Sequence, residues 1–83
     1  MQIKPLILTI KSREGDVFNE AVKTITSNND RGRFDVLSYH ANFISLIKDY
    51  IEYISLDDKV NKIPIRDAVM RVEENKVDVF MGI

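Results

Sequence analysis

Two neighbouring segments near the end of the chain alternate apolar and polar residues with a period of two. They cover residues 68–74 and 76–81, and Val77, Val79 and Met81 carry the pattern in the second segment. Successive side chains of a β-strand point to opposite faces, so this period is typical of strands with one buried face. Glu74-Asn75 joins the two segments, and Asn tolerates the positive φ of a tight turn. The sequence therefore predicts a β-hairpin here and an all-β fold around it.

The start of the chain repeats the same alternation. Residues 6–13 alternate and are rich in β-branched side chains, which favours a strand. Residues 14–16 have the composition of a turn. The pattern then resumes and continues to Thr26, which predicts a second strand with a bend at Asn19.

The middle of the chain contains a predicted loop and two predicted short strands. Residues 27–32 are rich in Asn, Asp and Gly, which predicts an exposed loop. A short strand is predicted at residues 34–37. Pro64 interrupts residues 60–66, and because proline lacks a backbone donor this segment is predicted to be an edge strand or the start of a strand.

Residues 42–54 fit two different structures. Their apolar positions form a helical face, but they also fit two strands that meet near Lys48-Asp49. Periodicity alone does not decide between these alternatives. The neighbouring strands recur about every 8–12 residues, which is the spacing of a sandwich or barrel and favours strands.

Composition and charge argue against several classes of partner. A chain of 83 residues is expected to form one domain, residues 1–83. Its 12 Lys and Arg and 13 Asp and Glu leave a net charge of −1, so nucleic acid is not an expected partner. The apolar patch at residues 6–8 is too short for a membrane span of about 20 residues. Cysteine is absent, which removes thiol chemistry and suits the cytoplasm.

The sequence contains no group of residues typical of an active site. His40 is the only histidine, and one imidazole without cysteine does not make a typical zinc site. The serines have no nucleophile motif around them, and there is no Gly-rich phosphate-binding loop. We therefore predict a chain that is not an enzyme, with no catalytic residues, no metal ligands and no cofactor.

Two segments in the first half of the chain resemble those of a known family. Residues 8–22 resemble its opening strand, its turn and a Val-Phe pair, here Val17-Phe18. Residues 32–42 are similar to its Gly-Glu-Leu-Gly-Ile-Leu-Pro-Gly-His-Ala-Pro segment, and they retain Gly32 and the pair His40-Ala41.

The end of the chain completes the resemblance. Residues 63–80 follow the family's last hairpin, whose Asp-Asn-Lys turn is Glu74-Asn75-Lys76 here. The order and spacing of the segments, from about residue 6 to residue 81, resemble the amino-terminal β-sandwich domain of the epsilon subunit of F-type ATP synthases.

The resemblance implies a β-sandwich of about ten short, mostly antiparallel strands. For residues 42–54 it implies a strand, a turn and a second strand. In the family a two-helix hairpin follows the sandwich and can inhibit ATP hydrolysis. Because the chain ends at Gly82-Ile83, we expect this regulatory hairpin to be absent.

The resemblance also implies a non-catalytic role in the rotor and its central stalk. The sandwich would bind the foot of the gamma subunit and the membrane ring of c subunits, and so help to couple ion translocation to ATP synthesis or hydrolysis. The positions that match the gamma-stalk contact are Ser12, His40 and Ser45. The positions that match the rotor-ring contact are Asn29, Asp30, Arg31, Gly32 and Arg33. The chain would lie at the cytoplasmic face of a membrane and be held there only through its partners.

Several positions depart from the family pattern. The family has Gly or Pro at positions occupied here by Asp35, Ser38-Tyr39, Asn42, Asp49-Tyr50 and Asp67-Ala68. Losing these residues predicts turns that are relaxed or bent differently. The family often has an acid at the position of Arg33, so the charge offered to a basic ring loop is reversed. These departures favour an alternative, a freestanding β-sandwich interaction module derived from this family, whereas the retained order of segments favours the stalk subunit.

Overall fold

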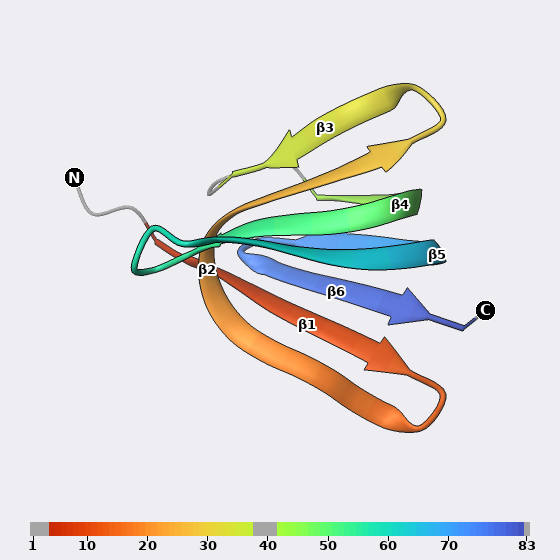
Figure 1. Cartoon of the computed structure of the whole chain (residues 1–83), viewed down its shortest axis with the longest axis horizontal. Coiled ribbons are helices and arrows are strands. Elements are labelled where there is room, and N and C mark those ends of the chain that lie inside the picture. Colours follow the sequence, from red (N-terminus) through yellow and green to blue (C-terminus); the bar gives the residue numbers. More distant parts are fainter. Residues whose placement is uncertain (1–3, 38–41, 83) are drawn as a thin grey trace.

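The computed structural model of the chain describes residues 4–37 and 42–82, and these residues form strands joined by short turns (Figure 1). The strands are β1 (Leu6–Ser12), β2 (Gly15–Asn29), β3 (Gly32–Val36), β4 (Phe43–Ser55), β5 (Val60–Glu73) and β6 (Lys76–Met81). The predicted all-β fold is confirmed. The prediction of about ten short strands is wrong, because the described residues contain six strands, of which three are long.

The strands pair into a closed arrangement. Their order is β1-β6-β5-β4-β2-β3, and β1 also pairs with β2. All neighbours are antiparallel except β1 and β6, which are parallel and in register from Ile7↔Lys76 to Lys11↔Phe80. The contact between β1 and β2 closes the sheet on itself, so the fold is a sandwich with the connectivity of a small barrel (Figure 1).

Irregular pairing explains why there are fewer and longer strands than expected. β2 runs for 15 residues and curves from β1 to the side of β3, with Lys23 as an extra residue between the pairs Val22↔Ser55 and Thr24↔Ile54. A bulge of this kind bends a strand without ending it. β4 continues through Lys48–Tyr50 in the same way, with a positive φ of 73° at Asp49. The expected turn near Lys48-Asp49 is therefore a bend inside one strand, and residues 43–55 are not a helix.

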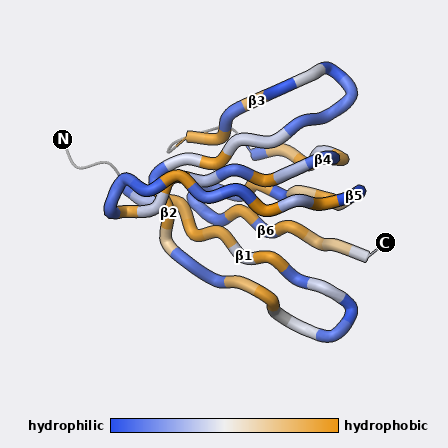
Figure 2. The backbone as a smooth tube through the Cα atoms, in the orientation of Figure 1, coloured by the Kyte–Doolittle hydropathy of each residue, from blue (hydrophilic) through white to orange (hydrophobic). Residues whose placement is uncertain are grey.

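The core lies between the layers and follows the period-two pattern. On β1 the side chains of Leu6, Leu8 and Ile10 are buried, and on β6 so are Val77 and Val79. Figure 2 shows apolar residues along these central strands and polar residues at the tips of the β1–β2 and β2–β3 turns. Burial of apolar side chains from all the long strands in one cluster supplies the main driving force for folding.

The predicted loop at residues 27–32 is mostly wrong. Ser27 and the residues up to Asn29 belong to β2, and only Asp30 and Arg31 form the turn. The polar side chain of Ser27 is fully buried because its hydroxyl donates a hydrogen bond to the carbonyl of Tyr50, at 2.7 Å. A short polar residue can replace an apolar one in a strand when its hydroxyl finds such a partner.

Two other turn and edge predictions are confirmed. Glu74 and Asn75 form the turn between β5 and β6, although the positive φ of 56° belongs to Glu74 and not to Asn75. Pro64 pairs with Tyr50 in the first half of β5, which has β4 on one side and no other strand of the described residues on the opposite side. Pro64 therefore lies in an edge part of its strand, where proline is tolerated.

Candidate docking surfaces

The residues predicted to face a rotor ring form the tip of the β2–β3 hairpin. Asp30 and Arg31 are exposed at the turn, and the side-chain oxygen of Asn29 accepts a hydrogen bond from the backbone N–H of Arg31, at 2.8 Å. Gly32 has a φ of 114°, a conformation that side chains disfavour. The sequence thus builds a tight turn at the tip of the β2–β3 hairpin (Figure 1), and the charged side chains at this turn are exposed.

Arg33 lies at the start of β3 and is paired within the chain. Its guanidinium is 3.6 Å from a carboxylate oxygen of Glu52 on β4, with the Arg33 side chain 65% exposed and that of Glu52 25% exposed. The pair borders a shallow hollow of about 370 Å³ that also contains Asp35, whose carboxylate accepts a hydrogen bond from Thr26 at 2.6 Å. Because Glu52 offsets the charge of Arg33, the surface here is less basic than the sequence alone indicates.

Ser45, predicted to face the stalk, lies beside the β2–β3 turn. The side-chain amide of Asn29 donates a hydrogen bond to the Ser45 hydroxyl at 3.3 Å, and that hydroxyl donates to the carbonyl of Leu46 at 3.2 Å. The structure therefore brings together one residue from each predicted contact surface. Both border a notch of about 270 Å³, lined by Asn29, Asp30, Arg31, Ile44, Ser45 and Leu46.

Ser12 lies in a different part of the sheet from Ser45, because it pairs with Gly15 at the β1–β2 turn whereas Ser45 pairs with Met70 of β5. Its hydroxyl donates to the carbonyl of Gly15 and accepts a hydrogen bond from the N–H of Glu14, both at 3.3 Å. Ser12 thus caps the β1–β2 turn. His40, the third predicted stalk residue, lies outside the residues that the structure describes.

Two exposed apolar side chains next to Ser45 were not singled out from the sequence. Ile44 and Leu46 are each 70% exposed, whereas Ile47 on the opposite side of β4 is buried. The signal that could have found them is the period of two: once residues 42–54 are treated as strands, Ile44 and Leu46 must face away from Ile47. The helical alternative for this segment obscured that separation.

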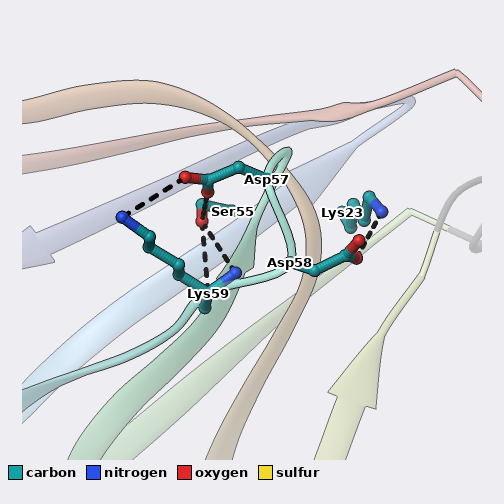
Figure 3. A network of polar contacts seen from close by, with 5 residues as sticks. All are labelled: Lys23, Ser55, Asp57, Asp58 and Lys59. Atoms are coloured by element: carbon teal, nitrogen blue, oxygen red, sulfur yellow. Dashed lines mark hydrogen bonds and ion pairs between the residues drawn. The ribbon is translucent and has the colours of Figure 1, made fainter.

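A polar network holds the turn between β4 and β5 (Figure 3). The hydroxyl of Ser55 donates to the carboxylate of Asp57 and accepts a hydrogen bond from the N–H of Lys59, at 3.2 Å. The Lys23 ammonium pairs with Asp58, so the extra residue of the β2 bulge is fastened to this turn. Asp57 and Asp58 therefore stabilise this turn through their contacts with Ser55 and Lys23.

Two groups have shifted pKa values. The hydrogen bond from Ser55 lowers the pKa of the Asp57 carboxyl, and hydrogen bonds from Lys59 contribute to the same effect. Burial raises the pKa of the Tyr53 phenol, and the nearby Glu20 carboxylate adds to the rise. Both shifts have structural causes, since Tyr53 packs against Phe18 with 5.1 Å between ring centroids.

Residues 4–37 and 42–82 contain neither a metal site nor a membrane helix. No group of three or more His, Cys, Asp or Glu side chains is arranged to hold a metal ion there. Nor does any helix in this part of the chain have the length and apolarity needed to cross a bilayer.

Two known proteins with sequences similar to this chain carry the same name. The ATP synthase epsilon chain of a Nitratiruptor species is 38% identical over 77 residues, which are 92% of this chain and 60% of that protein. The protein of the same name from Clostridium botulinum (strain Eklund 17B / Type B) is 31% identical over 75 residues, 89% of this chain and 56% of that one. This chain therefore spans less than two thirds of the length of these relatives.

Solved structures show the same fold. A chain of the Euglena gracilis mitochondrial ATP synthase (OSCP/F1/c-ring) matches 98% of this chain with a TM-score of 0.86 and 21% identity, over 53% of its own length. A chain from the central stalk and c-ring of the Tetrahymena thermophila mitochondrial ATP synthase matches 99% of this chain with a TM-score of 0.74 and 8% identity, over 67% of its own length. The family model of the ATP synthase delta/epsilon chain β-sandwich domain matches residues 5–82. The chain belongs to that family.

Proposed function

We propose that this domain is a non-catalytic part of the central stalk of an F-type ATP synthase, where it binds the gamma subunit and the ring of c subunits. The observation that carries the proposal is the family match over residues 5–82, supported by relatives named ATP synthase epsilon chain. The freestanding interaction module has no comparable support. In the proposed role the domain lies at the cytoplasmic face of a membrane, and its partners hold it there.

The architecture suits the transmission of torque between two partners. Close-packed side chains between two layers make a domain that deforms little under load. The closed pairing of β1 with β2 adds to this stiffness. A body of this kind needs two adhesive surfaces and no catalytic group.

The β2–β3 turn is the proposed ring contact, and Ser12, His40 and Ser45 mark the proposed stalk contact. The exposed Asp30 and Arg31 side chains offer charges of both signs to the polar loops of a ring. The pair between Arg33 and Glu52 reduces the repulsion that an unpaired arginine would cause against a basic ring loop.

Co-purification tests the proposed function. The tagged chain, produced in its source organism, is expected to recover both the gamma subunit and the c subunit. A double variant, Asp30→Ala with Arg31→Ala, should lose most of the c subunit and keep the gamma subunit, since only the exposed turn is altered. Lys59→Ala, at the exposed β4–β5 turn, serves as the matched control and should recover both. Recovery of no synthase subunit by the wild type would overturn the proposal.

A further inference from the structure

The shallow hollow beside Arg33 lies on the face of β3, β2 and β4 that is turned away from the core. Its volume is about 370 Å³, and its lining residues are Thr24, Thr26, Arg33, Asp35, Leu37, Glu52, Ile54 and Val60. The pairings Thr26↔Asp35 and Thr26↔Glu52 place one acid on each side of a central threonine. Farther along the strands, Ile54 pairs with Val60 of β5. The hollow therefore combines carboxylates with apolar side chains.

The three ionic side chains of this hollow do not balance. The guanidinium of Arg33 is 3.6 Å from a carboxylate oxygen of Glu52, so these two charges offset each other. Asp35 has no cationic partner among the described residues. One of its oxygens accepts a hydrogen bond from Thr26 at 2.6 Å, and Thr26 is only 8% exposed, so the carboxylate is held in place. The hollow keeps one net negative charge, and the second oxygen of Asp35 is available to a ligand.

The charges on β3 occupy positions where this chain departs from the family pattern. That pattern has glycine at position 35 and often an acid at position 33, whereas this chain has Asp35 and Arg33. Residues two apart in a strand share a face and lie about 7 Å apart. The acid of this chain is therefore farther from the β2–β3 turn. The charge arrangement of the hollow is a feature of this chain and is distinct from the turn itself.

The charged groups favour a cation over an anion. An anion would approach the carboxylate of Asp35 and would compete with Glu52 for Arg33. An ammonium group has three donors and no acceptor. Asp35, Glu52 and Thr24 offer it oxygen atoms from three adjacent strands, and the hydroxyl of Thr24 makes no hydrogen bond to the described residues. The hollow thus suits a primary ammonium.

The apolar wall favours an ammonium on an alkyl stem. Leu37 and Val60 are 50% and 62% exposed, so they are open to contact with methylene groups. A guanidinium is less suitable, because Thr26 already uses one of the two oxygens that its planar fork would pair with on Asp35. A diamine is also less suitable, since its second ammonium would find no further uncompensated charge in the hollow.

We propose that this hollow binds the side chain of a lysine from a partner protein. The ammonium lies at the free oxygen of Asp35, and the methylene groups lie against Leu37 and Val60. The lysine backbone is neutral, so the single charge of the ligand matches the single net charge of the hollow. The inference goes beyond the proposed function and does not rest on it, because no synthase subunit enters the argument.

An NMR titration of the isotope-labelled chain with Nα-acetyl-lysine methylamide tests the site. Saturable shifts are expected at the amides of Thr24, Thr26 and Glu52. The dissociation constant should be roughly 1–10 mM, the weak affinity of one side chain. Nα-acetyl-norleucine methylamide has a stem of similar length without the ammonium, and it should bind at least about tenfold more weakly because it forms no charge-assisted hydrogen bond.

Two matched variants separate the hollow from general attraction between charges. Asp35→Asn should weaken binding of the lysine probe by about tenfold, because a charge-assisted contact is lost. The asparagine side-chain oxygen still accepts a hydrogen bond from Thr26, so the hollow keeps its shape. Asp67→Asn removes the same charge from an exposed position outside the hollow, and the affinity should stay within about twofold of the wild type. Equal weakening by the two variants would overturn the site.

Three further outcomes would overturn the inference and leave the proposed function untouched. Absence of saturable shifts around the hollow would show that no ammonium binds there. Equal or tighter binding of Nα-acetyl-arginine methylamide would show that the hollow does not select lysine. Binding of butane-1,4-diamine at least about tenfold tighter than the lysine probe would show that the ligand is a free amine and not a protein side chain.

Discussion

Ser55 is the central residue of the network that holds the β4–β5 turn. Its one hydroxyl donates to Asp57 and accepts from the N–H of Lys59. Because the donated bond favours the charged carboxylate, it lowers the pKa of Asp57. A single buried hydroxyl therefore sets both the shape of the turn and the acidity of an exposed group.

The lowered pKa predicts how acid affects this turn. The folded chain binds the Asp57 proton less tightly than the unfolded chain, whose Asp has the ordinary pKa of 3.8. The contribution of Asp57 to stability is thus complete above that value and is lost as the pH falls through the lowered folded pKa. An NMR titration of the Asp57 carboxyl should show a midpoint below 3.8 in the wild type and closer to 3.8 in Ser55→Ala. Ser45→Ala should leave the midpoint low, and an unchanged midpoint in Ser55→Ala would contradict the assigned cause.

The contact between Asn29 and Ser45 illustrates what sequence cannot supply at the residue scale. The resemblance assigned these two residues to different surfaces, and no local pattern connects residues that are 16 positions apart. The bend of β4 brings its first half under the β2–β3 turn, and that bend depends on pairing with β2 and β5. Long-range pairing of this kind is invisible to periodicity.

Strand β4 changes direction at Asp49. The backbone of this residue has a conformation that glycine adopts more easily than residues with a Cβ. Its φ is 73°, and a left-handed conformation costs roughly 1 kcal/mol or more for a residue with a Cβ. The family pattern has a Pro-Gly pair at positions 49 and 50. Because proline fixes φ near −65°, the positive φ at position 49 is not the geometry of a Pro-Gly turn, and pairing with β2 and β5 holds this bend in place.

This strain predicts opposite effects of glycine at two facing positions of β4 and β5. Asp49→Gly should raise the free energy of unfolding by up to about 1 kcal/mol, because the strain is relieved. Asp67→Gly, on the facing part of β5 where φ is not positive, should lower it by roughly 0.5–1 kcal/mol. Urea denaturation of the two variants measures both changes. A loss of stability in Asp49→Gly as large as that in Asp67→Gly would show that the carboxylate of Asp49 outweighs the strain.

At the scale of elements, the sequence predicts strands better than it predicts their ends. Period-two patterning correctly places strands over the segments that form β1, β3 and β6, and it identifies the Glu74-Asn75 turn. It divides long strands where the composition becomes polar, as in residues 27–29, because a bulge or a buried hydroxyl leaves no periodic signal. The figure of about ten strands, which the resemblance implies, exceeds the six observed because the bulged strands continue through such positions.

Closure by β1 organises the whole molecule. β1 pairs with β2 on one side and with β6 on the other, so the first strand of the chain joins elements that are far apart in sequence. Its side chains at Leu6, Leu8 and Ile10 are buried in the common core. Loss of packing at β1 should therefore affect the entire fold.

Truncating a β1 core residue tests this dependence. Leu8→Ala should lower the free energy of unfolding by about 2–5 kcal/mol, a large part of the roughly 5–15 kcal/mol typical of a domain. Leu56→Ala removes a side chain that is 54% exposed and should cost less than about 0.5 kcal/mol. Urea unfolding followed by circular dichroism and by tyrosine fluorescence should show one shared transition in both variants. Separate transitions for the two probes would show that β1 is not integral to a single cooperative unit.

The parallel pairing of β1 and β6 has a consequence for how the domain breaks. Parallel neighbours begin at the same end of the sheet, so a pull on the start of β1 and on the finish of β6 acts along the strands in opposite directions. The hydrogen bonds from Ile7↔Lys76 to Lys11↔Phe80 are then sheared together, whereas an antiparallel pair pulled from one end would unzip bond by bond. Rupture along this axis requires every bond of the row to fail at once.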